Sequence, residues 1–174
     1  MASKSIEELS KEELLQLIDL YSKNWLALDG VWFQSIEQKF GMAEAMQHDE
    51  NAWRSFTVIE ATRIKSFLNL PQRAGIEGLK KALSYRFYAN LNEDEIIVEN
   101  NILIYRTLNC RVQTARQRKQ MEFHPCKSVG IIEYTYFAKT IDDRFDCEAI
   151  SCYPDITDAS CNCSWKFTLS DRSF

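Results

Sequence analysis

Hydrophobic residues in the first half of the chain recur at steps of three and four, the period of an amphipathic helix. The sequence Ser10-Lys11-Glu12-Glu13 is a capping box, and the pattern that follows it continues to Phe40. Gly41 then supplies a helix stop, because glycine tolerates a left-handed backbone. We therefore predict one long helix over residues 10–40, with Gly30 as a point where it could kink or split.

Two further helices are predicted before residue 90. Asp49 is suited to cap a helix that runs through Trp53 to Leu70, where Pro71 ends it. A shorter helix is expected from about Gly75 to Tyr85. Acidic residues on these apolar stretches, and Arg63 three residues after Glu60, favour ion pairs that hold helices together. The acidic residues are Asp29, Glu37 and Glu60.

The hydrophobic period changes to two after residue 90. Strands are predicted over 95–98 and 102–112, joined by a tight turn at Asn100-Asn101. A helix over 129–141 and strands over about 144–153 and 161–169 follow. In the second strand one face is expected to carry Ile102, Ile104, Leu108, Cys110 and Val112. In the last strand one face is expected to carry Cys161, Cys163, Trp165, Phe167 and Leu169.

This order predicts an α+β domain. N-terminal helices over 1–90 should pack on one face of an antiparallel sheet of β-β-α-β-β order, formed by residues 91–174. The 174 residues, 45% of them hydrophobic, suffice for one domain with its own core. We expect a single domain over 1–174, and the sequence leaves a homo-oligomer open.

Charge and hydropathy limit the classes of partner that the protein could bind. The 21 basic and 25 acidic residues are spread along the chain, and no basic face with interleaved aromatics stands out, so we expect no nucleic-acid partner. No apolar run approaches the roughly 20 residues that span a bilayer, and the first residues lack the apolar core of a signal peptide. We therefore expect no membrane association, a cytoplasmic location and reduced cysteines.

Five of the six cysteines fall after residue 120, and Cys126 has the strongest reason to be reactive. Pro125 is favoured in the first turn of a helix, which places Cys126 at the N-terminus of the predicted 129–141 helix. The helix dipole, together with His124 and Lys127 beside it, would stabilise a thiolate there. The competing interpretation is a small buried hydrophobic residue.

The remaining cysteines allow a metal site. The last two strands should form a hairpin that places Cys152 near Cys161 or Cys163, and Cys110 would share their face if its strand lies beside them. Four thiolates from Cys110, Cys126, Cys152 and Cys163 would suit zinc or an iron–sulfur cluster. The chain has no CxxC pair, so a core that uses cysteine for its size is the alternative.

Two polar residues could assist a reactive thiol. Asp155 lies in the hairpin loop, where it could orient a histidine or accept a proton, or simply form the turn. His124 could pair with Cys126, provided that the loop bends enough to bring side chains two residues apart together.

Six segments together carry a resemblance. They are Trp25–Phe33, Glu60–Ile64, Cys110–Arg116, His124–Lys127, Cys152–Asp155 and Cys163–Phe167. They resemble a family of uncharacterised cytosolic proteins of anaerobic bacteria and archaea. That family is distantly similar to L-2-amino-thiazoline-4-carboxylic acid hydrolases, which open a cyclic amidine. The resemblance implies Cys126 or Cys152 as nucleophile, Asp155 as acid or base, and Arg111 or Arg116 as the group that binds a substrate carboxylate.

Two functional interpretations remain open at this point. One is a cysteine-dependent hydrolase of a compact, carboxylate-bearing nitrogen heterocycle. The other is a non-catalytic redox or sensor domain whose clustered cysteines bind a metal or a small ligand.

Overall fold

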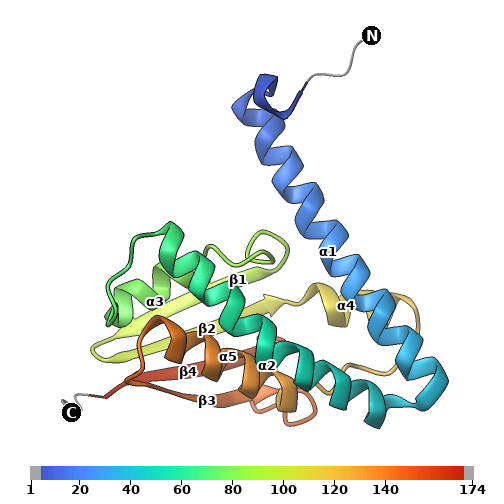
Figure 1. Ribbon diagram of the computed structural model, residues 1–174. Coiled ribbons are helices and arrows are strands. Elements are labelled where there is room, and N and C mark those ends of the chain that lie inside the picture. The colour runs from blue at the N-terminus through green and yellow to red at the C-terminus, as the bar shows by residue number, and fades with distance from the viewer. Residues whose placement is uncertain (1–4, 171–174) are drawn as a thin grey trace.

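The computed structural model describes residues 5–170 (Figure 1). A short 3-10 turn, Ile6–Glu8, precedes the first helix. The helices are α1 (Lys11–Phe40), α2 (Met42–Phe67), α3 (Gly75–Leu83), α4 (Arg111–Arg118) and α5 (Lys127–Ile141). The strands are β1 (Glu93–Glu99), β2 (Ile102–Asn109), β3 (Phe145–Cys152) and β4 (Cys163–Leu169). The α+β class predicted from the sequence is confirmed.

The four strands form one antiparallel sheet in the order β1-β2-β4-β3. A tight turn joins β1 to β2, and Asn100 adopts the positive φ of 53° that such a turn requires. The chain then leaves the sheet through α4 and α5 and returns as β3. Strand β4 therefore lies between β2 and β3, where residues of all three strands can contribute to one site.

Helix α5 covers one face of the sheet, and α2 lies alongside α5 (Figure 1). The core between α5 and the sheet contains Phe137, Trp165 and Phe167, each at most 1% exposed. Gly130 of α5 lies directly against Trp165, because a Cβ at this position would come within 2.6 Å of the indole ring. The missing side chain lets the helix approach the sheet closely.

A buried arginine connects these layers. Arg86 donates to Glu60 of α2 through Nε and Nη2, at 3.0 and 2.7 Å, and to Glu133 of α5 through Nη1 at 2.6 Å. The hydroxyl of Tyr88 also donates to Glu133. A buried charge is tolerated when it is paired and hydrogen-bonded in this way. The network holds α2, α5 and the chain before β1 in fixed relative positions.

Several predicted boundaries are confirmed. Ser10 and Glu13 form the capping box of α1, and Gly41 ends that helix. The N-terminus of α5 and the strands β3 and β4 lie close to their predicted positions. Trp165 and Phe167 are buried on the predicted core face of β4.

Other predictions for the helices are wrong. Helix α1 is continuous through Gly30. Helix α2 begins at Met42 rather than at Asp49, so Asp49 lies inside the helix and does not cap it. The expectation that Glu60 forms an ion pair connecting helices is confirmed, but its partner is Arg86 rather than a residue of its own helix.

The prediction for the second strand is also wrong in two respects. Strand β2 ends at Asn109, and residues 111–118 form α4, which adds a helix to the expected order. The buried side chains of β2 are Leu103, Tyr105 and Thr107, so the expected face is the opposite one. Cys110 lies at the N-cap of α4 and not on a strand.

Candidate active site

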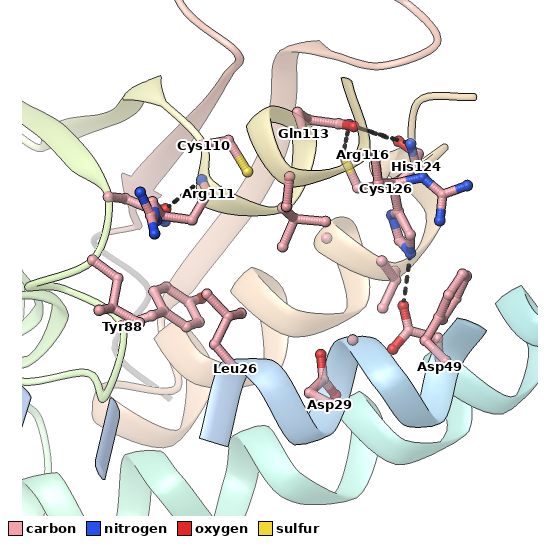
Figure 2. Close-up of a pocket in the computed structure, with 18 of the residues that line it drawn as sticks. Leu26, Asp29, Asp49, Tyr88, Cys110, Arg111, Gln113, Arg116, His124 and Cys126 are labelled. Carbon is pink, nitrogen blue, oxygen red and sulfur yellow. Dashed lines mark hydrogen bonds and ion pairs between the residues drawn. The ribbon is translucent and has the colours of Figure 1, made fainter. Parts of the chain in front are cut away.

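A cavity of about 390 Å³ lies between α1, α2, α4, α5 and the sheet. Large apolar side chains form much of its wall, including Trp25, Phe33, Trp53 and Val129. Figure 2 shows polar side chains that face it, which come from α1, α2, α4, the segment before β1 and the loop that leads into α5. A cavity of this size suits a compact ligand, since typical small-molecule sites are roughly 300–1,000 Å³.

Cys126 lines this cavity as the N-cap residue of α5. Its sulfur lies 3.5 Å from the sulfur of Cys152 and 3.6 Å from Nε2 of Gln113. The backbone N–H groups at the start of a helix have no partner within the helix and carry partial positive charge. The structure therefore places the thiol where the sequence predicted, at a position that favours the thiolate.

His124 and Asp49 extend the site away from the thiol. Nε2 of His124 lies 3.2 Å from Oδ2 of Asp49, and both side chains are about one-tenth exposed (Figure 2). The other ring nitrogen, Nδ1, is buried and has no hydrogen-bond partner within residues 5–170. The loop between α4 and α5 thus brings the histidine between a carboxylate and the Cys126 thiol.

Neighbouring charged side chains shift the pKa values of His124 and Cys126. A hydrogen bond from Cys152 and the neighbouring His124 lower the pKa of Cys126 to about 5, although burial acts in the opposite direction. Burial lowers the pKa of His124, but Asp49 and Cys126 outweigh it and raise this pKa to about 9. At neutral pH the pair is therefore a thiolate and an imidazolium.

Gln113 of α4 fixes the position of His124. Its side chain donates to the His124 carbonyl at 2.8 Å and accepts from the His124 backbone N–H at 3.0 Å. The same amide nitrogen reaches the Cys126 sulfur. Because Gln113 is buried, these contacts hold the loop and the thiol in one arrangement.

Cys110, Cys152 and Cys163 also line the cavity, so the four predicted cysteines lie around one space. Cys152 and Cys163 are direct cross-strand partners on β3 and β4. Cys152 has a single proton and can donate to only one neighbouring sulfur at a time. Since His124 lies beside Cys126, we assign the thiolate to Cys126. Burial raises the pKa of Cys110 to about 12, so that thiol stays protonated.

The arrangement of these sulfurs differs from that of a metal centre. Within residues 5–170, no three His, Cys, Asp or Glu side chains are placed to hold one metal ion. All six cysteines in this part of the chain are free thiols. Cys147 and Cys161 do not line the cavity.

The remaining predicted residues fall in different places. Asp155 is exposed, pairs with Lys127 at 2.7 Å and does not line the cavity. Arg116 lines it but is buried in a two-pronged pair with Glu37, at 2.9 and 2.6 Å. Arg111 also lines the cavity, is exposed, and its guanidinium has no hydrogen-bond or ion-pair partner within the described chain.

Sequence reasoning missed the roles of Asp49 and Gln113. Asp49 shares a helical face with Trp53 and Glu60, and a carboxylate among core positions is a signal that could have identified it. Gln113 offered no such signal, because the segment that carries it was expected to be a strand.

Fold and site together define a small α+β protein with a cysteine, a histidine and an aspartate aligned on one cavity wall. The chain belongs to the family of unknown function DUF6125, which matches residues 7–169. No curated protein and no solved structure matches it. Within residues 5–170, no helix is both long and apolar enough to cross a membrane.

Proposed function

We propose that this protein is a cytoplasmic, cysteine-dependent hydrolase of a compact, carboxylate-bearing nitrogen heterocycle. The observation that carries the proposal is the alignment of Cys126, His124 and Asp49 on the cavity wall. A nucleophile, a base beside it and a third group that orients the base are the parts of nucleophilic catalysis. The free thiols fit a reducing compartment.

The reaction would proceed in two steps. The Cys126 thiolate bonds to the electrophilic carbon of a cyclic amidine, and the bond from that carbon to the leaving ring atom breaks. That atom is nitrogen in an all-nitrogen ring and sulfur in a thiazoline, and His124 donates its proton to it. Water then attacks the carbon bonded to sulfur, with His124 as base, and the thiolate leaves. Asp49 keeps the imidazole oriented and stabilises its charged form.

Arg111 is our candidate for the substrate carboxylate. Arg116 donates through both terminal nitrogens to Glu37 and through Nε to the Glu122 carbonyl, so binding a substrate would break existing bonds. The guanidinium of Arg111 has no such partners and offers a planar, two-pronged fit to a carboxylate.

A direct test uses 2-amino-thiazoline-4-carboxylate and related cyclic amidines with purified protein. We expect ring opening, followed by chromatography, and its loss in Cys126→Ser. Cys147→Ser is the matched control, since Cys147 lies outside the cavity, and it should keep full activity. Equal turnover in Cys126→Ser and the wild type would eliminate Cys126 as the nucleophile.

The runner-up is non-catalytic binding of a soft metal or small ligand, favoured by the four cysteines around one cavity. Metal analysis of protein purified without oxygen, combined with thiol titration with and without a chelator, distinguishes the two functions. Four thiols that react only after metal is removed would support binding. One thiol that reacts fast in metal-free protein would support the hydrolase.

A further inference from the structure

Asp29 of α1 faces the cavity, with its carboxylate directed into the space below the thiols (Figure 2). Helix α1 is continuous at this point, and Gly30 follows Asp29 without interrupting it. The carboxylate makes no hydrogen bond or ion pair with any residue in the range 5–170. The side chain is partly buried, so water does not replace the missing protein partners as it does for an ordinary surface residue.

The other two acidic side chains of the cavity wall are already neutralised. Asp49 lies 3.2 Å from the His124 ring, and Glu133 accepts from Arg86 at 2.6 Å. Glu37, the other acidic residue noted in the helical half next to this region, is paired with Arg116. The sequence predicted ion pairs for the acidic residues of the helical half, and Asp29 does not form one among the residues that the structure describes.

The surroundings of Asp29 make its charge costly without a partner. Burial, and then the nearby carboxylates of Asp49 and Glu133, raise its pKa to about 6, although His124 acts in the opposite direction. At neutral pH the group is still largely ionised. A carboxylate that is removed from water without a protein cation is stabilised when a ligand brings the cation.

We propose that Asp29 binds a positively charged nitrogen of the substrate, such as an amidinium or ammonium group. This inference rests on the proposed function, which identifies the carbon that reacts. It adds that the substrate carries a positive charge. With Arg111 available for a carboxylate, the cavity would select a zwitterion: a cationic nitrogen directed to Asp29 and a carboxylate directed to Arg111.

The test measures binding and does not depend on thiol chemistry. Benzamidinium and neutral benzamide have nearly the same shape, and the aromatic wall of the cavity suits either ring. Their dissociation constants are measured by calorimetry with Cys126→Ser protein, so that no covalent reaction intervenes. The same measurements are made after adding Asp29→Asn, and separately after adding Glu12→Gln.

We expect benzamidinium to bind more tightly than benzamide, and Asp29→Asn to weaken benzamidinium binding on the order of tenfold. Benzamide binding should not change. Glu12 is the matched control, because it lies on the same helix, is exposed and does not line the cavity. Thermal melting of each variant confirms that it is folded.

Equal binding of the two compounds, absence of binding by either, or the same benzamidinium affinity in Asp29→Asn would each overturn the proposal. Failure of the hydrolase proposal gives a different result: benzamidinium would still bind through Asp29, while Cys126→Ser would leave turnover unchanged.

Discussion

At the scale of single residues, the pKa of Cys126 is the property on which the chemistry depends. The thiol owes its low pKa to groups from other segments, namely Cys152 of β3 and His124 of the preceding loop. Neither group would have this effect in an unfolded chain, where a cysteine has a pKa of about 8.5.

The alkylation rate of Cys126 should therefore follow an unusual pH profile. We expect the rate with iodoacetamide, measured by mass spectrometry of the Cys126 peptide, to rise with a midpoint near pH 5 and to level off by pH 7. His124→Gln should move the midpoint upwards, because the cation that stabilises the thiolate is lost. A midpoint above pH 8 in the wild type would contradict the assignment.

The contact between Cys126 and Cys152 also predicts a response to oxidants. Their sulfurs are 3.5 Å apart and need to approach to about 2.05 Å to bond. Hydrogen peroxide should oxidise the Cys126 thiolate to a sulfenic acid with release of water, and attack by Cys152 should release a second water and leave a disulfide.

Peptide mapping after treatment with one equivalent of peroxide should find the Cys126–Cys152 linkage, and a dithiol should reverse it. In Cys152→Ser the sulfenic acid should persist and be trapped by dimedone. A wild-type protein in which Cys126 oxidises without forming this linkage would show that the two thiols do not meet.

At the scale of elements, Gly130 is the position where α5 packs most closely against Trp165 of the sheet. We expect Gly130→Ala to lower the free energy of unfolding by about 1–3 kcal/mol, since the new Cβ would lie 2.6 Å from a Trp165 ring that is only 1% exposed. Urea unfolding followed by circular dichroism measures this. Ser128→Ala, at an exposed position in the first turn of α5, is the control and should change stability far less.

The elements also show what the sequence could predict. Strongly periodic segments were assigned correctly, as in α1, α5 and β4. In α5 and β4 the burial of one face determines the structure, and in α1 the capping box at Ser10 and the stop at Gly41 also mark the ends. The start of α2 was missed because residues 42–48 contain few large apolar side chains to define a period, and only Gly41 separates the two helices.

Helix α4 could not be predicted for a different reason. Its first N–H groups are bound by side chains far away in the sequence: Cys110 N–H donates to Asn162 at 2.6 Å and Arg111 N–H to Asn92 at 3.0 Å. These tertiary contacts end β2 and begin a helix where the local pattern favours a longer strand. Gln113 was missed as a consequence.

The site itself was predicted in part. Pro125 placed Cys126 at a helix N-terminus, as the structure has it. The predicted hairpin placed Cys152 near Cys161 or Cys163, and the structure pairs it with Cys163. Asp155 was placed near the thiols only because it is close to Cys152 in sequence. Its side chain points to solvent, where Lys127 binds it.

At the scale of the whole molecule, the N-terminal half of α1 extends beyond the body of the protein (Figure 1). Apolar side chains on it are more than half exposed, including Leu15 at 56%, Ile18 at 51% and Tyr21 at 57%. Folded monomers rarely expose a contiguous apolar patch of this kind. We expect two copies of the chain to associate through this segment, since the same patch on each copy makes a two-fold contact.

Sedimentation of the wild type should show a dimer that dissociates on dilution, and Leu15→Lys combined with Ile18→Lys should give a monomer. The control is Ile156→Lys, which changes an apolar residue that is 45% exposed in the loop between β3 and β4. A wild type that remains monomeric at high concentration would disprove the association.

The buried Arg86 network has a consequence for how the protein folds. Asp49 and His124 lie far apart in the sequence, and they meet only when α2 and α5 dock on either side of that arginine. The fast-reacting thiolate is thus a product of tertiary docking and not of any single helix. Pulses of an alkylating reagent during refolding at pH 6 would label Cys126 rapidly only after this docking. The time at which labelling becomes fast would therefore report when the core forms.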